Sequence, residues 1–369
     1  MRILVPTLSF GRAGGYRVLS EFANQWIKEG HEVDFLVNEA SDQPYFPTNA
    51  GIRWVSNYGR ISNQRKRKQR RRHYFTGLAK WLSLWFGLLE IGKEYDVIMA
   101  NQSLTAWPVA FAPCGSAKKF YYVQAYEPEC LEFGYENMDI KRKVEVWLSR
   151  KSYDLKLIQV SNSPVYIHYE NVRAQSWVPP GVDFEIFFPK REYKTFSSAE
   201  EIVIGCIGRK EPFKGMQYVL EAFETLWAQD HRYKLHVAFD NIPGGWSHPG
   251  LIVSVPKSDI ELGEYYRSVD IMIAHGMLQL GGPYLPVMEA MACGTPVVNT
   301  GHVPANAQNS WLIRSGDVES IVVAIRTLAA DVDYRERVAI ASTDIAPYEW
   351  SKVSKRMLEL FSATAGRLR

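Results

Sequence analysis

The sequence predicts an α/β protein made of two doubly wound domains, each with a parallel sheet between helices. Short apolar runs, typical of strands buried on both faces, alternate with longer runs of helical period in both halves of the chain. A stretch rich in proline and glycine, SWVPPGVDFEIFFP, separates the two series. The length of 369 residues and the hydrophobic fraction of 46% are sufficient for two buried cores.

Composition and charge argue against several classes of protein. A net charge of +3 does not favour nucleic-acid binding. The four cysteines form no CxxC pair, so neither a disulfide framework nor a zinc site is indicated. The first ten residues contain too short an apolar run for a signal peptide, and no apolar stretch reaches the ~20 residues of a spanning helix. We therefore expect a reduced, cytoplasmic protein.

The first half begins with a predicted strand at 3–5, a loop containing Gly14 and Gly15, a helix over 16–28 and a strand over 31–37. This order is that of a nucleotide-binding unit, although the glycine spacing differs from the dinucleotide fingerprint. The remaining expected elements of this half are strands at 96–100, 119–127 and 156–160 and helices ending at 111 and spanning 140–152.

Residues 65–72, RKRKQRRR, are the strongest charge run, and the aromatic stretch 73–92 follows. The aromatic stretch is interpreted as a helix that covers the sheet, because its apolar side chains lie nearly all round it. Seven cations beside aromatic residues suit an anionic lipid surface, so membrane docking is predicted for 65–75. Nucleic acid is the rival interpretation of the same run. The predicted membrane cations are Arg65, Lys66, Arg67, Lys68, Arg70, Arg71 and Arg72.

The stretch 270–300 predicts a ligand loop. A buried strand at 271–274 leads into a glycine-rich turn, a helix over 285–292 and a second strand at 297–298. Backbone N–H groups and the positive end of the helix dipole at such a turn suit an anion or a cluster of sugar hydroxyls. A tight turn without a ligand is the alternative interpretation.

The block GGPYLPVMEAMACGTPVV resembles the signature of the retaining GT-B glycosyltransferases of the large fourth family (group 1), which has two glutamates separated by seven residues. Glu289 matches the second acid, and Gly281 stands where the family has the first. The resemblance implies that Glu289 holds the ribose hydroxyls of a nucleotide sugar. It also implies that the backbone from Gly282 to Leu285, through Pro283 and Tyr284, meets the donor sugar and phosphate. The family's usual acidic contact to that sugar is absent at Gly281.

Other segments carry the same resemblance. GRKEPFKG resembles the family element in which an Arg and a Lys clamp the donor diphosphate, here Arg209 and Lys214. Cations at the end of a strand suit a diphosphate on physical grounds as well. The family's nucleobase contact falls near Val255, and its last helix corresponds to PYEWSKVSKRMLELF. The implied domains are an acceptor-side domain 1–178, a linker 179–200, a donor domain 201–345 and a returning helix 346–369.

On the acceptor side, the resemblance places Gly14 and Gly15 beside the donor phosphates. Many family members have a histidine at the end of the strand over 119–127, where this chain has Gln124, Tyr126 and Glu127. The form YYVQAYEP is similar to a subset that includes bacterial rhamnosyl- and mannosyl-type transferases of surface polysaccharides. Glu127 either orients or deprotonates an acceptor hydroxyl, or it caps the next helix or pairs with a cation.

The resemblance implies a GT-B fold and retaining transfer of a sugar from a dTDP-, GDP- or UDP-sugar to a hydroxyl of a glycan or lipid-linked glycan. The expected setting is bacterial surface polysaccharide assembly, at the inner face of the plasma membrane. No cofactor, metal or nucleic acid is expected; Asp331 and Asp333 are interpreted as helix caps. Two alternatives stay open, a nucleotide-sugar-binding GT-B protein with little or no activity and a GT-B sugar-nucleotide epimerase.

Overall fold

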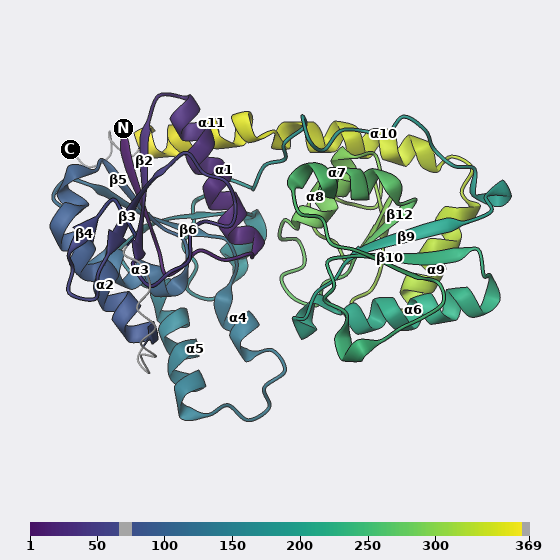
Figure 1. Ribbon diagram of the computed structural model, residues 1–369, viewed down its shortest axis with the longest axis horizontal. Coiled ribbons are helices and arrows are strands. Elements are labelled where there is room, and N and C mark those ends of the chain that lie inside the picture. The colour runs from purple at the N-terminus through teal and green to yellow at the C-terminus, as the bar shows by residue number, and fades with distance from the viewer. Residues whose placement is uncertain (66–75, 364–369) are drawn as a thin grey trace. The chain divides into compact units, whose positions relative to one another are not determined.

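The structure, a computed structural model, describes residues 1–65 and 76–363 and divides into two units (Figure 1). Unit 1 comprises Met1–Gly181 together with the chain from Trp350 onward, and unit 2 comprises Val182–Glu349. None of the helices in these described ranges is both long and apolar enough to cross a bilayer.

Unit 1 contains an eight-stranded sheet in the order β4-β3-β2-β1-β5-β6-β7-β8, parallel except for the β3–β4 pair. Its central strand β5, residues Val97–Ala100, consists only of buried apolar residues, because helices cover both faces of the sheet. The strands are β1 (Arg2–Thr7), β2 (Glu32–Asn38), β3 (Gly51–Val55), β4 (Ile61–Ser62), β5 (Val97–Ala100), β6 (Lys118–Val123), β7 (Ile158–Ser161) and β8 (Ser176–Trp177).

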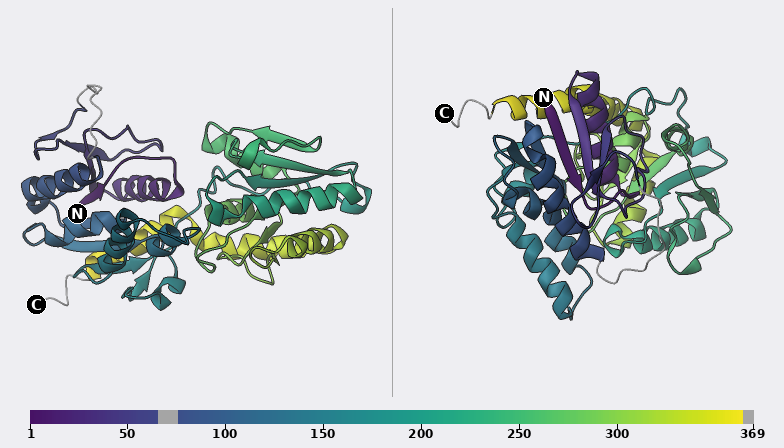
Figure 2. Two further views of the ribbon diagram at one scale, coloured as in Figure 1. Left: turned by 90° about the horizontal axis from the view of Figure 1, so that it is seen from below. Right: turned by 60° about the vertical axis from the view of Figure 1, so that its left-hand side comes forward.

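Helices lie on both sides of this sheet (Figure 2). The aromatic stretch forms α2, and its buried residues Leu84, Leu88 and Ile91 pack against the sheet, as predicted for a covering helix. On the other face, α1 packs with α11, where Trp26 contacts Phe361 at 5.4 Å between ring centres. The helices are α1 (Gly14–Lys28), α2 (Thr76–Ile91), α3 (Ser103–Phe111), α4 (Glu127–Glu132), α5 (Ile140–Ser152) and α11 (Trp350–Ala363).

Unit 2 has a six-stranded, wholly parallel sheet in the order β11-β10-β9-β12-β13-β14. One face packs against α6 and α9, and the other packs against α7, α8 and α10. The strands are β9 (Ile202–Ile207), β10 (Tyr233–Ala238), β11 (Leu251–Ser254), β12 (Ile271–Ala274), β13 (Val297–Asn299) and β14 (Trp311–Leu312). The helices are α6 (Met216–Gln229), α7 (Asp259–Ser268), α8 (Leu285–Ala292), α9 (Val318–Ala330) and α10 (Tyr334–Ile345).

The predicted linker 179–200 is divided differently by the structure, since 182–200 belongs to unit 2. Phe187 is fully buried against Tyr266, and Lys190 donates from Nζ to the Val269 carbonyl at 3.0 Å. The second passage between the units lies beside the first, because the Val182 N–H donates to the Tyr348 carbonyl at 2.7 Å. These contacts fix the first part of the segment 182–200 to α7 and the residue after it in unit 2.

Candidate functional site

Three loops follow neighbouring strands at the carboxyl edge of the unit 2 sheet. Between β9 and β12 the strand order reverses, because β10 and β11 lie on one side and β13 and β14 on the other. Ligand crevices in open parallel sheets form at such switch points. The loops after β9, β12 and β13 contain the two predicted cations, the glycine loop and residues 300–302. Arg209, Lys214 and the predicted glycine loop are therefore brought to one edge.

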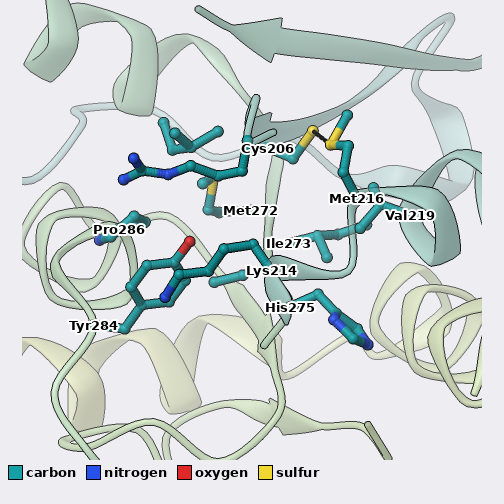
Figure 3. A pocket seen from close by; sticks show the side chains of 12 residues that line it. Cys206, Lys214, Met216, Val219, Met272, Ile273, His275, Tyr284 and Pro286 are labelled. Atoms are coloured by element: carbon teal, nitrogen blue, oxygen red, sulfur yellow. Dashed lines mark hydrogen bonds between the residues drawn. The ribbon is translucent and has the colours of Figure 1, made fainter. Parts of the chain in front are cut away.

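The two cations lie next to Tyr284. Lys214 ends a 3-10 turn, Pro212–Lys214. Its Nζ lies over the Tyr284 ring, 4.3 Å from the ring centre (Figure 3). Arg209 follows β9, and its Nε is buried with no hydrogen-bond partner among the described residues. Burial lowers the pKa of Arg209, but the neighbouring Tyr284 hydroxyl and the Glu211 carboxylate raise it overall, so the cation persists. A buried guanidinium with an unused donor suits an anion.

The glycine loop is held by hydrogen bonds to the segments on both sides of it. The Met277 N–H donates to the Phe213 carbonyl at 2.9 Å, and the Gly281 N–H donates to the Gly301 carbonyl at 2.8 Å. Gly281 has a φ of +87°, in the left-handed region that favours glycine. An acid at position 281 would be strained in this loop conformation, which gives a physical reason for glycine where the family has its first glutamate. The remaining predicted backbone, Gly282 to Leu285, leads directly into α8.

Glu289 lies in the second turn of α8 and is buried. Its Oε2 accepts a hydrogen bond of 2.8 Å from the Tyr266 hydroxyl, and the field of Tyr266 also raises the pKa of Arg209. Burial and a phenol donor hold the carboxylate in one orientation beneath the loop. Its contact to ribose hydroxyls stays a prediction.

His302 is a site residue that the sequence did not identify. Its Nδ1 lies 3.2 Å from the Gly282 carbonyl, which can only accept, so Nδ1 carries the hydrogen. Nε2 is then an acceptor, and it is buried without a partner among the described residues. Burial, followed by the charge of Lys214, lowers the pKa of His302 to about 4. The ring also packs against Tyr284, with 5.0 Å between ring centres. The only sequence signal was a polar side chain shortly after a buried strand.

The enclosed space among these residues is small. Arg209, Lys214, His275, Tyr284 and Pro286 line a cavity of about 10 Å³, room for about one water molecule. A larger ligand therefore has to lie over this cavity and against the loops, with its anionic part at the two cations.

Gly215 connects the lysine turn to α6, and we expect its replacement by alanine to be costly. It has a φ of +63°, and an added Cβ would collide with the His275 ring. We expect Gly215→Ala to lower the free energy of unfolding by about 2–5 kcal/mol, from left-handed strain of about 1–2 kcal/mol and an overpacking cost of about 1–3 kcal/mol. Gly244→Ala is the matched control, because Gly244 has a φ of +66° and open space around the added carbon. Equal losses in urea denaturation would contradict a steric role for His275.

In unit 1 the corresponding switch point lies between β1 and β5. Gly14 and Gly15 begin α1 after the loop 8–13 that follows β1, and a Cβ on Gly15 would lie 3.3 Å from Oε1 of Gln124. Tyr126 is buried and stacks on Tyr153 with 5.3 Å between ring centres. Gly14, Gly15 and Gln124 thus lie near the carboxyl edge of this sheet. Their contacts to donor and acceptor stay predictions.

Glu127 has a structural task. Oε1 accepts from the Ser103 backbone N–H at 2.8 Å, and Oε2 accepts from the Ser103 hydroxyl at 2.5 Å. Since Ser103 is the first residue of α3, the carboxylate caps this earlier helix, and Glu127 itself begins α4. Burial raises the pKa of Glu127, against the effect of the hydrogen bonds from Ser103. A role at an acceptor hydroxyl stays a prediction.

Three further predictions fall elsewhere. Val255 is exposed just after β11, and no described contact tests its role with a nucleobase. Arg65 pairs with Asp42 at 3.4 Å, whereas 66–75, the rest of the predicted membrane segment, lies outside the described residues. Asp331 ends α9 and Asp333 precedes α10.

Comparison with known proteins shows what this chain is similar to. Residues 201–331 match the family model described as glycosyl transferases group 1. The chain is 26% identical over 215 residues to a D-inositol 3-phosphate glycosyltransferase of Corynebacterium glutamicum (strain R), covering 51% of each chain. It is 29% identical over 216 residues to the protein of that name from Corynebacterium jeikeium (strain K411), covering 50% of each. The chain spans about half the length of the curated relatives it matches.

Solved structures match along nearly the whole chain. A sucrose-phosphate synthase from Thermosynechococcus elongatus aligns with a TM-score of 0.74 at 15% identity, covering 99% of both chains. Anabaena Alr3699/HepE, solved in complex with UDP and glucose, aligns with a TM-score of 0.68 at 17% identity, covering 98% of this chain and 100% of that one. At these identities the likeness concerns the fold. The chain thus has the GT-B fold, and residues 201–331 are similar to the group 1 glycosyl transferases.

Proposed function

We propose that the protein transfers a sugar from a nucleotide-sugar donor to an acceptor hydroxyl with retention of anomeric configuration. The observation that supports this most is the pair of cations at the switch point of unit 2, with the unused donor of Arg209 among them. A nucleoside diphosphate is the leaving group that such a pair would stabilise as charge develops on it. Among the described residues, neither Arg209 nor Lys214 is in an ion pair within 4.0 Å that would compete with a phosphate.

The donor sugar would lie against the glycine loop. The helix α8 begins at Leu285, directly after Tyr284, and the positive end of a helix favours a negative group. His302 Nε2 offers a buried acceptor beside Gly282 for a sugar hydroxyl. These groups support donor binding within unit 2 alone.

A thermal-shift panel tests the donor. UDP-, GDP-, dTDP- and CMP-sugars would be compared with the free nucleotides, because a ligand of the native state raises Tm by linkage. We expect one nucleotide class to give a clear rise, larger for the sugar nucleotide than for the nucleoside monophosphate, since the diphosphate meets the cations. A uniform absence of shifts would contradict the proposal.

Acceptors then separate the classes of function. Lipid-linked glycans and phosphorylated polyols would both be offered with the donor identified, because some relatives are named D-inositol 3-phosphate glycosyltransferases. We expect a transferred sugar whose anomeric proton in NMR has the configuration of the donor. Donor binding without transfer to any acceptor would favour a nucleotide-sugar-binding protein, an alternative favoured by the left-handed glycine at 281. Conversion of the donor sugar without an acceptor would favour an epimerase.

A further inference from the structure

The outward face of α5 is apolar. Ile140, Val144 and Trp147 are spaced by four and three residues, so they form one stripe along the helix. Their exposed fractions are 82%, 49% and 57%. A helix on the surface of a protein normally turns such a stripe inward, toward the core. In α5 the stripe faces solvent.

The opposite face shows that α5 is firmly seated in this orientation. Val146 and Ser149 are buried, and the helix packs on α3 and α4. Arg150 binds Glu132 of α4 through one nitrogen at 2.7 and 2.8 Å. Trp107 of α3 donates from Nε1 to the Leu148 carbonyl at 3.2 Å. The apolar stripe is therefore not a core face turned outward by a loose helix. In Figure 1, α5 extends from unit 1 beside α4.

Aromatic surface continues onto α3. Phe111, with an exposed fraction of 62%, stacks on Trp107 with 6.0 Å between ring centres. Because Trp107 also donates a hydrogen bond to α5, the Phe111 ring that stacks on it lies next to the same helix. Tryptophan and phenylalanine at such positions are typical of residues that enter the boundary between lipid headgroups and acyl chains.

The charge around the stripe is positive. Within Ile140–Ser152 there are five lysines and arginines and one acid, so this helix carries more net positive charge than the +3 of the whole chain. Lys143 and Lys151 are exposed beside the stripe. Among the neighbouring acids, Glu145 lies near Lys141 and Arg142, Asp154 lies 3.1 Å from Lys151, and Asp139 caps the helix by accepting from the Arg142 N–H. An apolar stripe edged by lysines complements an anionic lipid surface.

We propose that α5 is a membrane-docking helix, which lies in the interface of an anionic bilayer with Ile140, Val144 and Trp147 inserted. A protein partner fits less well. Stable protein interfaces bury ~800 Å² on each partner and involve about 20–30 residues a side, far more than one stripe and its lysines. An interfacial helix needs only its own face. The proposal concerns described residues, is separate from the predicted segment 65–75, and does not depend on sugar transfer.

Vesicle flotation tests the proposal. The full chain would be mixed with vesicles of phosphatidylcholine alone or of phosphatidylcholine with phosphatidylglycerol. We expect binding to the anionic vesicles that weakens with added salt. Ile140→Ser, Val144→Ser and Trp147→Ser together should lower the partition coefficient at least about tenfold, because the inserted apolar surface is removed. The matched control is Ile260→Ser, Val323→Ser and Val332→Ser, which removes three exposed apolar residues of unit 2 and should bind like the wild type.

Both triple variants would also be compared in a background where the cations of 65–72 are replaced by glutamine. Loss of binding on replacing 65–72 alone, with the α5 variant still binding like the wild type, would overturn the proposal. So would an absence of wild-type binding, or an association between protein molecules that the α5 variant abolishes while no vesicle binding occurs. Brominated lipids provide a second readout, since they should quench wild-type fluorescence more than that of Trp147→Phe. The donor-induced rise in Tm should stay unchanged in the α5 variants, which separates this test from that of the proposed function.

Discussion

Lys214→Ala and Arg209→Ala are each expected to remove the donor-induced rise in Tm and to lower kcat by about a hundredfold or more. The reason is that both cations stand at the switch point of unit 2 beside Tyr284, where the leaving diphosphate would acquire charge. Steady-state transfer with saturating donor separates kcat from donor binding. A larger effect on kcat than on the donor KM would mean that the cations act mainly in the transition state.

The control for this pair is Arg326→Ala, which removes an exposed cation of α9. It changes the net charge of unit 2 by the same amount and should leave Tm shifts and kcat unchanged. Tyr284→Phe keeps the aromatic ring beneath Lys214 and should retain most donor binding, whereas Tyr284→Ala should not. Turnover retained in both Lys214→Ala and Arg209→Ala would contradict a diphosphate clamp.

The second large effect is a loss of folding stability at acidic pH. Burial lowers the pKa of His275 to about 4, and burial together with the charge of Lys214 lowers the pKa of His302 to about 4. Both rings are neutral in the folded chain, while the unfolded chain takes up protons below about 6.5. The unfolded state therefore binds more protons between these values, so stability rises with pH there. The stabilisation is fully present above about pH 6.5 and is lost as the pH falls toward 4, by about 3 kcal/mol for each histidine.

Urea denaturation at a series of pH values measures this loss. Replacing His302 with glutamine should make the dependence of the unfolding free energy on pH shallower between about pH 6.5 and 4. The change in slope, and not the absolute stability of the variant, is the relevant result, since glutamine can weaken packing by itself. A second variant would have both His275 and His302 replaced with glutamine. If its unfolding free energy depends on pH as steeply as that of the wild type, the acid sensitivity belongs to other groups.

Much of unit 2 was predictable because its signals are local. The bounds expected for the strand at 271–274 and the helix at 285–292 agree with β12 and α8. Continuous apolar runs, a proline near the helix start and a glycine after its end determine these elements within the segment itself. The gathering of Arg209, Lys214 and the glycine loop at one edge depends on the strand order, and it was expected only through the family resemblance.

The parts that were not predicted depend on distant contacts. Glu127 caps α3 through Ser103, twenty-four residues earlier, whereas the structural roles expected from the sequence were a cap of the next helix or a pair with a cation. His302 is a site residue because its ring meets Gly282 and Tyr284, and no local pattern encodes that meeting. Ile140, Val144 and Trp147 showed helical spacing in the sequence, but spacing alone does not tell which way an apolar stripe faces.

The return of the chain to unit 1 has a consequence for biosynthesis. The side chains of α11 complete the core around Trp26, where Phe361 is fully buried, and Trp350 packs against Phe22 with 5.2 Å between ring centres. The ribosome makes these residues after the whole of unit 2. All residues of unit 2 are therefore synthesised before α11, and until then the apolar face of unit 1 that α11 covers is exposed. During this interval the nascent chain is most exposed to aggregation and to capture by chaperones.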